Sequence, residues 1–359
     1  MAKPVERISR LVRMFDHEDR RADYVRLDKN ERTVPFPRDV IDRLRESVVT
    51  DLLTAYPDTI PVIQKLSAFL GILPDYVLLT NGSDAGIKAV FETFIASGDR
   101  VLLLSPGYAM FGVYCDMYEA EKVWVEFEAE FSLPPERLLR AITEETRMVL
   151  IANPNQPTGT RLEPELLEGV VARSRACGAI VLLDEAYYPF CQDTGMSLLP
   201  TYEDLLIART FSKGWGLAGL RLGYLVGSPE NLRQIAKVKS LYDVNAFALA
   251  AAACLLDEAE RVAAHVAEVV AGRERLRTGL QELGFRPFDS HTNFVMARVP
   301  AGVDPAGLVR DLRQAGFLVR GPFSHPALTG CLRMTAGPPD QVAAFLTALG
   351  HVLARRGLR

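Results

Sequence analysis

The stretch LLIARTFSKGWGLAGLRLGYLV, residues 205–226, joins two apolar runs through a turn rich in small residues. A short apolar run bounded by turn residues is typical of a strand buried in a sheet. We therefore expect strands at Leu205–Thr210 and Leu222–Val226. The glycines between them predict a turn, and this turn carries Lys213 and Arg221.

The same pattern continues upstream, where apolar runs alternate with segments of helical period. Ser83–Ser97 is expected to form a helix, with Ser83 as its N-cap and Gly98 as its stop. Pro164–Ala176 is expected to form another helix, which ends at Gly178. This alternation predicts an α/β domain built on a mostly parallel sheet covered by helices. The remaining strands are expected at Tyr76–Thr80, Val101–Ser105, Met148–Ala152 and Ile180–Leu183.

The pattern changes after Asn245, where a helical stretch rich in Ala, Glu and Arg runs to the region of Leu283. Shorter strands and a closing helix from Pro339 follow, which predicts a smaller α+β domain. We expect an N-terminal arm at 1–35, a large domain at 36–244 and a small domain at 245–359. The strands of the small domain are expected at Thr292–Arg298, Phe317–Arg320 and Cys331–Thr335.

The composition of the chain argues against several classes of function. The chain has 41 basic and 45 acidic residues, a net charge of −4, so no global positive field attracts nucleic acid or an anionic membrane. The five cysteines are scattered and the five histidines show no ligand or triad spacing, so we expect neither disulfides nor a metal site. The charged N-terminus forms no apolar signal segment and the apolar runs are too short to span a bilayer, which predicts a cytoplasmic location.

Lys213 lies directly after a predicted strand, beside Ser212 and before Arg221. A partly desolvated amine near another cation has a lowered pKa and becomes nucleophilic, which suits the formation of a Schiff base. Ser212 and Arg221 would then hold a phosphate group. For a lysine taken alone, a solvated surface position is the alternative interpretation.

Asp184 and Glu185 stand at the carboxyl end of another predicted strand, in LLDEAYY at 182–188. Ligands bind at this end of the strands in open α/β sheets. A carboxylate there can keep a pyridine nitrogen protonated, which turns the ring into an electron sink. Asp184 and Lys213 are 29 residues apart, one βαβ step, so adjacent strand ends would present both. The alternative is that the acidic pair caps the next element.

Three further motifs have both a functional and an ordinary interpretation. Gly82, Ser83 and Asp84 lie between a strand and a helix and would form an anion site or a plain helix cap. The segment ANPNQPTG at 152–159 is either a plain loop or a loop in which a cis peptide bond orients side-chain amides toward a ligand. Arg333 within an apolar strand needs an anionic partner, either a substrate carboxylate or phosphate or an internal salt bridge.

Taken in order along the chain, these motifs resemble the fold-type-I pyridoxal-phosphate aminotransferases, whose fold is aspartate aminotransferase-like. Within that group the chain is most similar to the histidinol-phosphate aminotransferase family. The likeness runs from LDKNE at 27–31 through Ala55-Tyr56-Pro57 to the C-terminal end.

The resemblance implies a pyridoxal 5'-phosphate cofactor, with Lys213 as its Schiff-base lysine and later the proton carrier. Asp184 would pair with the pyridinium nitrogen, Tyr187 with the phenolic oxygen, and Tyr108 would stack on the ring. The resemblance also implies a homodimer in which Tyr56 reaches the cofactor phosphate of the neighbouring subunit, and an arm that joins the small domain. It places Gly82, Ser83, Asp84, Ser212 and Arg221 around the phosphate, and Arg333, Asn30, Tyr56 and Asn155 near the substrate.

The chain departs from the family pattern at three places. Gln156 stands where the family usually has Asn before Pro-Thr-Gly, so Asn155 and Gln156 are both candidates for the cofactor contact. The chain has Gly-Ser-Asp-Ala at 82–85 where the histidinol-phosphate enzymes tend to have Gly-Ala-Asp-Glu. The arm segment Ile8–Met14 shows no clear match to their substrate-contacting tyrosine.

The expected activity is a ping-pong transfer of an amino group from an amino acid donor, glutamate in the first instance, to an oxo acid or oxo-phosphate. An alternative within the same cofactor class is decarboxylation, or elimination followed by cyclisation, of an amino acid. A non-catalytic ligand sensor of the same fold is a third interpretation, which the absence of a basic face in the composition disfavours.

Overall fold

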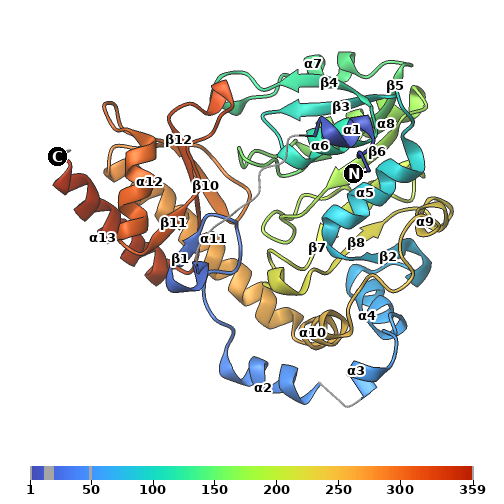
Figure 1. Cartoon of the computed structure of the whole chain (residues 1–359), viewed down its shortest axis with the longest axis horizontal. Coiled ribbons are helices and arrows are strands. Elements are labelled where there is room, and N and C mark those ends of the chain that lie inside the picture. Colours follow the sequence, from blue (N-terminus) through green and yellow to red (C-terminus); the bar gives the residue numbers. More distant parts are fainter. Residues whose placement is uncertain (1, 12–19, 48–50, 358–359) are drawn as a thin grey trace.

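The computed structural model describes residues 2–11, 20–47 and 51–357 (Figure 1). The arm predicted at 1–35, and its segment Ile8–Met14, therefore lie partly outside the described residues. Three short or peripheral helices belong to the first part of the chain: α1 (Glu6–Ser9), α2 (Arg38–Glu46) and α3 (Asp51–Thr54).

The large sheet has seven strands within the described residues. All are parallel except β8, which is antiparallel to both of its neighbours, β7 and β2. The prediction of a mostly parallel sheet is thus confirmed. In spatial order the strands are β2 (Val77–Thr80), β8 (Gly223–Val226), β7 (Leu205–Thr210), β6 (Ile180–Asp184), β5 (Thr146–Ala152), β3 (Arg100–Ser105) and β4 (Glu121–Glu126).

The edge strand β4 was not predicted from the sequence. Its residues, EKVWVE, mix charged and apolar side chains, and Trp124 is exposed. A strand at the edge of a sheet with one open side lacks the continuous apolar run that marks the inner parallel strands. The strands that were predicted are all present, with ends shifted by one or two residues where they differ.

Helices cover both faces of this sheet because successive side chains of each strand point to opposite faces. Val101 and Leu103 pack into one apolar cluster, whereas Leu102 and Leu104 pack into another. The first cluster is completed by α5 (Gly82–Phe94), α6 (Ala109–Met117) and α9 (Pro229–Ala236). The second is completed by helices that include α4 (Ile60–Leu70), α7 (Pro135–Ala141), α8 (Pro164–Ala176) and α10 (Ala246–Asp257).

Helix α5 differs from the prediction at both ends. Its N-cap is Asn81, and Ser83 lies inside the first turn, so the assignment of Ser83 as N-cap is wrong. The helix ends at Phe94 instead of continuing to Ser97, because Ile95 adopts an extended conformation and buries its side chain beside Phe91. By contrast, α8 has the predicted bounds.

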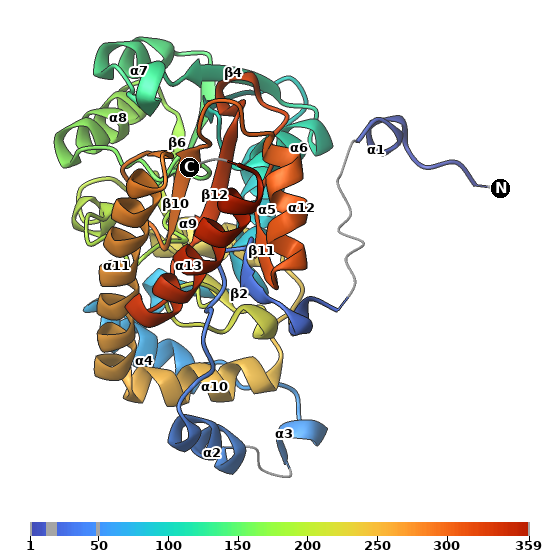
Figure 2. The same ribbon diagram turned by 90° about the vertical axis from the view of Figure 1, so that its left-hand side faces the viewer.

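The small domain is an antiparallel sheet covered by helices. β10 (Phe294–Arg298) pairs with β12 (Cys331–Thr335) and with β9 (Arg286–Pro287). Figure 2 shows α11 (Ala259–Glu282), α12 (Pro305–Gln314) and α13 (Pro339–Arg355) over this sheet. β1 (Val25–Leu27), from the N-terminal part of the chain, pairs in parallel with β11 (Phe317–Val319). The exact division at residues 35/36 and 244/245 stays a prediction.

The helical stretch expected from Asn245 to the region of Leu283 consists of two helices, α10 and α11. The break falls at Glu258, whose backbone leaves the helical region with φ −106° and ψ 25°. Its side chain forms ion pairs with Arg43 and Arg261. One of these partners, Arg43 of α2, is distant in sequence.

Many of the loops that connect strands and helices lie at one edge of the large sheet. The carboxyl ends of the parallel strands, and the beginning of the reversed strand β8, must all lie there. Figure 1 shows the arrowheads of β3 and β4 pointing toward the small domain. The predicted site residues that follow β2, β3, β5, β6 and β7, and those that precede β8, are thereby brought to the side that faces the small domain.

Gly223 lies at a point of this edge where backbone atoms crowd around it. A Cβ atom on Gly223 would lie 2.4 Å from the amide nitrogen of Ser83 and 2.9 Å from the carbonyl oxygen of Arg209. Because backbone atoms cannot move aside as flexible side chains do, we expect Gly223→Ala to lower the free energy of unfolding by about 1–3 kcal/mol. Urea denaturation followed by far-UV circular dichroism measures this loss.

Gly219→Ala is the matched control, since a Cβ atom there would meet nothing within 4 Å. We expect it to change the free energy of unfolding by less than about 0.5 kcal/mol. Equal denaturation midpoints for the two variants would contradict the crowding of Gly223.

Candidate active site

The N-terminus of α5 forms an anion cradle with two side chains from the β7–β8 region. Within the described structure no side chain caps the first turn of this 13-residue helix, so its amide groups are free for a ligand. A Cβ atom on Gly82 would lie 2.6 Å from Nη2 of Arg221, so glycine allows the guanidinium to approach. Arg221 also donates to the hydroxyl oxygen of Ser212 at 3.3 Å. Helix dipole, hydroxyl and guanidinium together suit a phosphate.

Asp84 lies in the same turn and faces Tyr108. The Tyr108 hydroxyl donates to Oδ1 of Asp84 at 3.1 Å, and Nη2 of Arg221 lies 4.0 Å from Oδ2. Burial, with the negative charge of Asp84, raises the pKa of Tyr108. Tyr108 therefore stays protonated and is held beside the cradle.

Asp184 ends β6 and is only 5% exposed. One of its oxygens accepts the amide of Ala186 at 3.0 Å. Burial raises the pKa of Asp184 to about 7, and the negative charge of Asp84 adds to the effect. A cation placed against this carboxyl group would restore its ionised form, as a protonated ring nitrogen does.

Lys213 lies within the same group, with its Nζ donating to the carbonyl oxygen of Lys29 at 2.7 Å. Burial, together with the positive charge of Arg333, lowers the pKa of Lys213 to about 8. An amine with this pKa is neutral in part of the population at neutral pH and is therefore nucleophilic.

Tyr187, Gln156 and Asn30 form a hydrogen-bond chain. The Tyr187 hydroxyl donates to Oε1 of Gln156 at 2.5 Å and accepts from Nδ2 of Asn30 at 2.8 Å. Burial raises the pKa of Tyr187 to about 12. Asn30, with a positive φ of 58°, is fixed by the hydroxyl of Thr335, which accepts its amide at 3.1 Å. The hydroxyl of Tyr187 is thus protonated and oriented.

Asn155 is engaged within its own loop. Its Nδ2 donates to the carbonyl oxygen of Pro106 at 3.0 Å and to the hydroxyl of Thr158 at 2.8 Å. Of the two amides left open by the sequence, Gln156 is therefore the one that contacts Tyr187. The peptide bonds Asn153–Pro154 and Gln156–Pro157 are both cis.

Arg333 is 6% exposed on β12, and its Nη2 donates to the carbonyl oxygen of Asp28 at 2.7 Å. Its Nε has no hydrogen-bond partner among the described residues. Arg320 is a residue that the sequence analysis missed. It exchanges backbone hydrogen bonds with Arg333 at 2.9 and 2.8 Å, and residues paired in this way present their side chains on one face.

The two arginines repel each other. Burial lowers the pKa of Arg333, and the positive charge of Arg320 lowers it further. Two neighbouring guanidinium groups with a buried free donor form a site for an anion. The sequence held no signal for this pair, because the pairing of 320 with 333 depends on the tertiary arrangement of the small domain.

Tyr56 is not brought to this group within the single chain. Its side chain is 76% exposed and stacks on Tyr242, with ring centroids 4.2 Å apart.

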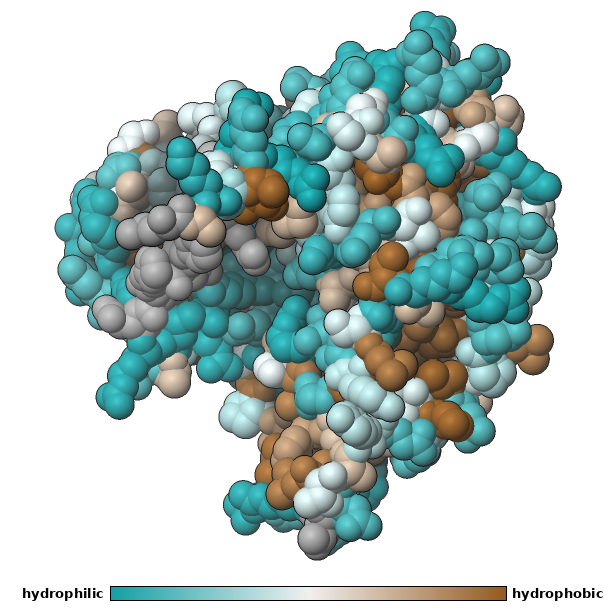
Figure 3. Space-filling view, turned by 45° about the vertical axis from the view of Figure 1, so that its right-hand side comes forward, coloured by the Kyte–Doolittle hydropathy of each residue, from teal (hydrophilic) through white to brown (hydrophobic). Residues whose placement is uncertain are grey.

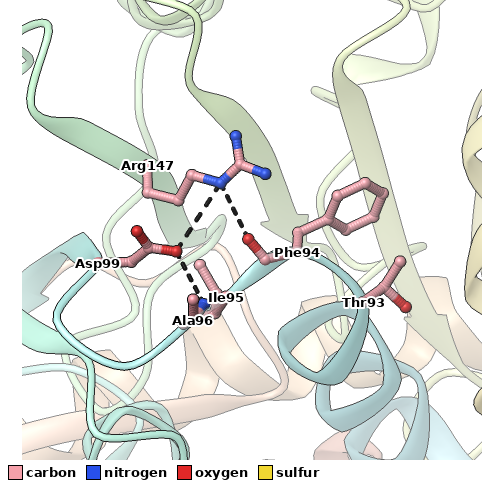
Figure 4. Close-up of a pocket in the computed structure, with 6 residues that line it drawn as sticks. All are labelled: Thr93, Phe94, Ile95, Ala96, Asp99 and Arg147. Atoms are coloured by element: carbon pink, nitrogen blue, oxygen red, sulfur yellow. Dashed lines mark hydrogen bonds and ion pairs between the residues drawn. The ribbon is translucent and has the colours of Figure 1, made fainter.

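The large domain has a surface hollow that lies away from the candidate site residues (Figure 4). Thr93 and Phe94 line it at the carboxyl end of α5, roughly 18 Å along the helix from Gly82. Its arginine, Arg147, donates to the carbonyl oxygen of Phe94 at 2.9 Å and pairs with Asp99. The hollow therefore offers no free charge to a ligand.

In residues 2–11, 20–47 and 51–357, His, Cys, Asp and Glu side chains form no group of three suited to a metal ion. The helices of that same part of the chain include none that is long and apolar enough to cross a membrane.

Solved structures identify the fold. Histidinol-phosphate aminotransferase from Sinorhizobium meliloti, in complex with pyridoxal-5'-phosphate, superposes with a TM-score of 0.86 and 24% identity over 99% of both chains. A mutant aspartate aminotransferase from Thermus thermophilus gives a TM-score of 0.80 and 22% identity over 98% of this chain and 100% of that chain. The architecture is therefore the aspartate aminotransferase-like fold, fold type I.

The sequence gives the family. Residues 22–349 match the model of aminotransferase class I and II. Histidinol-phosphate aminotransferase 1 of Carboxydothermus hydrogenoformans is 35% identical over 332 residues, covering 92% of this chain and 93% of that protein. The Sinorhizobium fredii enzyme is 31% identical over 331 residues, covering 92% and 89%. This chain belongs to the class I and II aminotransferases, enzymes that transfer amino groups.

The lowered pKa of Lys213 has a measurable consequence. Only the neutral amine reacts with acetic anhydride, so labelling of Lys213 should rise with pH through a midpoint near 8 instead of the ordinary 10.5. Arg333→Met removes a like charge and should move this midpoint upward. Competitive labelling with mass spectrometry of the Lys213 peptide measures both.

The control is Arg356→Met, which removes a cation that pairs with Asp311 in the small domain. It should leave the labelling midpoint where it is. A downward shift in Arg333→Met would show that the arginine does not act on Lys213 through its charge.

Proposed function

We propose that this chain is a pyridoxal-phosphate-dependent aminotransferase of the histidinol-phosphate aminotransferase type, which moves an amino group from an amino acid donor, glutamate in the first instance, to an oxo acid or oxo-phosphate. The observation that carries the proposal is the placement of Lys213, Asp184 and the anion cradle at one edge of the sheet. The names of the relatives point to the same reaction.

The residues present fit pyridoxal phosphate group by group. The cradle of Gly82, Ser212 and Arg221 suits its phosphate, and the buried carboxyl of Asp184 suits a protonated ring nitrogen. Gln156 and Tyr187 are hydrogen-bonded to each other, and their amide and hydroxyl groups would contact its phenolic oxygen. We further assign Ser83 and Asp84 to the phosphate turn, and Tyr108 to the face of the ring.

Bound pyridoxal phosphate supplies an electron-withdrawing ring that stabilises negative charge at the substrate Cα. The chain supplies the proton transfers. The Nζ of Lys213, with its lowered pKa, would be the group that takes the proton from the substrate Cα and later gives it back. Asp184 would hold the protonated ring nitrogen, and the hydroxyl of Tyr187, held by Asn30, would contact the phenolic oxygen.

Arg333 and Arg320 define the substrate class. Their guanidinium groups lie on one face of the small-domain sheet, and an anion between them relieves their repulsion. We assign them a substrate carboxylate or phosphate ester. Asn30 is placed beside them through Thr335, and we assign it to the same end of the substrate. Asn155, engaged within its loop, supports the site indirectly.

Replacement of Lys213 tests the proposal. Lys213→Ala should lose the visible absorption band of the bound cofactor and lower kcat by roughly 10²–10⁴-fold or more. The wild-type band should shift to the ultraviolet when one donor of a panel containing glutamate and histidinol phosphate is added. Absorbance spectra and a coupled oxo-acid assay measure these effects.

Arg356→Met is the control and should keep both the band and the turnover. Normal turnover by Lys213→Ala would remove the basis of the proposal. Release of carbon dioxide or water without transfer of the amino group would replace it with decarboxylation or cyclisation.

We also propose a homodimer. Large apolar side chains are exposed on α3 and α4, between these two helices, before α10 and on α10 itself. Figure 3 shows apolar residues on the lower part of the molecule. A patch of this kind marks an interface. A second copy covers it and receives Tyr56 in its own site. The exposed residues are Leu53, Tyr56, Ile60, Leu241, Tyr242 and Phe247.

Subunit complementation tests the shared site. Tyr56→Ala and Lys213→Ala should each be weakly active alone. In a mixed dimer, one site has its own Lys213 and receives the intact Tyr56 from its partner. Mixing under exchange conditions should restore about a quarter of the wild-type activity, the share that random pairing allows.

If Tyr56 serves its own chain, mixing would restore nothing, which would contradict the proposal. Light scattering on the same samples shows whether they are dimers.

We place the protein in the cytoplasm. All five cysteines lie in the described part of the chain and are free thiols. Persistent free thiols of this kind are the rule in reducing compartments.

A further inference from the structure

Glu185 and Arg209 form an ion pair in the interior, directly behind the candidate site. Nε and Nη2 of Arg209 donate to Oε2 of Glu185 at 2.9 and 2.7 Å. Both side chains are only 2% exposed. Removing two charges from water is costly and offsets most of their attraction, so such a pair does little for stability by itself.

The surrounding groups satisfy the pair. Glu185 accepts the amide of Gly195 at 2.7 Å and the hydroxyl of Thr194 at 2.7 and 2.9 Å. The guanidinium carbon of Arg209 lies 3.6 Å from the centre of the Tyr188 ring. The loop 186–195 is therefore anchored at both ends by one carboxylate.

The position of the pair links it to the site. Glu185 follows Asp184 and donates its amide to the carbonyl oxygen of Ala208 at 2.8 Å, so it continues the pairing of β6 with β7. Because successive side chains alternate, Glu185 points away from the face to which Asp184 points. Tyr187 follows two residues later, and Lys213 follows Arg209 by four. The pair thus joins the two strand ends that carry these groups.

The pair also determines the net charge next to Asp184. The groups whose charges act on Asp184 are Asp84, Glu185 and Lys213, and the negative charge of Glu185 raises the Asp184 pKa beyond the effect of burial. Arg209, paired at hydrogen-bond distance, offsets this charge. Without Arg209, two adjacent carboxylates would share a buried site, which disfavours ionisation of both.

We propose that the Glu185–Arg209 pair is a positioning element that locks the ends of β6 and β7, so that Asp184 and Tyr187 face Lys213, and that its neutrality keeps Asp184 charged. The inference rests on the proposed function, because Asp184 must be ionised in order to hold a protonated ring nitrogen.

The test is the pH dependence of the dissociation constant of the full-length chain for pyridoxal phosphate. In the wild type, affinity should fall as the pH falls through the Asp184 pKa, because a protonated carboxyl no longer pairs with the ring nitrogen. Glu185→Gln leaves the Arg209 charge and should move this midpoint down. Arg209→Met leaves the Glu185 charge and should move it up, each by about one pH unit. The double variant should return near the wild-type midpoint.

Two controls separate charge from folding. Arg209→Lys keeps the charge but loses the two-pronged contact, so it should hold the wild-type midpoint while kcat falls more than KM changes. Arg356→Met should leave the midpoint and both kinetic constants unchanged. Thermal melting checks that each variant folds, and if Arg209→Met does not fold, Glu185→Gln and Arg209→Lys decide the matter.

Opposite shifts in the two single variants support the proposal, since a merely structural role would move both in one direction. Shifts in the same direction, or an unchanged midpoint in Glu185→Gln, would overturn it. Failure of the proposed function is a separate result: the wild-type chain would then bind no pyridoxal phosphate at any pH.

Discussion

The hydrogen-bond ladder of the parallel sheet is the constraint on which the site depends. Parallel pairing forces the carboxyl ends of β3, β5, β6 and β7 to one edge, and the reversed strand β8 starts at that same edge. Lys213 therefore arrives after one strand, Asp184 ends another, and Arg221 precedes β8. Gly223 lets three backbone segments meet there, and the Cβ atom of any larger residue would crowd them.

Burial at this edge then tunes the chemistry. The same loss of water raises the pKa of Asp184 to about 7 and lowers that of Lys213 to about 8. An acid and a base that ordinarily titrate far apart are thereby brought toward neutral pH. The buried Glu185–Arg209 pair lies next to Asp184 in the sheet. Because its two charges cancel, it adds no net charge to the interior.

The N-terminal segment closes the site from the side of the small domain. The carbonyl oxygens of Asp28 and Lys29 accept hydrogen bonds from Arg333 and Lys213, respectively. Asn30 joins the same segment to Tyr187 and, 305 residues away in sequence, to Thr335. Arg333 and Lys213 are thus held by the carbonyl oxygens of two adjacent residues. A substrate anion that binds to the same nitrogen of Arg333 would displace the carbonyl oxygen of Asp28.

Local sequence determined the buried strands and the helix at 164–176, because continuous apolar runs and glycine-rich turns are visible within each segment. It also placed the candidate residues Lys213, Asp184 and Arg221 at strand ends. Tertiary structure alone decided the half-exposed edge strand β4, the break at Glu258 and the open first turn of α5. It also decided that Arg320 lies beside Arg333 and that Gln156, not Asn155, contacts Tyr187. The physical reason is the same in each case: these features depend on contacts between residues distant in sequence, and no periodicity or local propensity records those contacts.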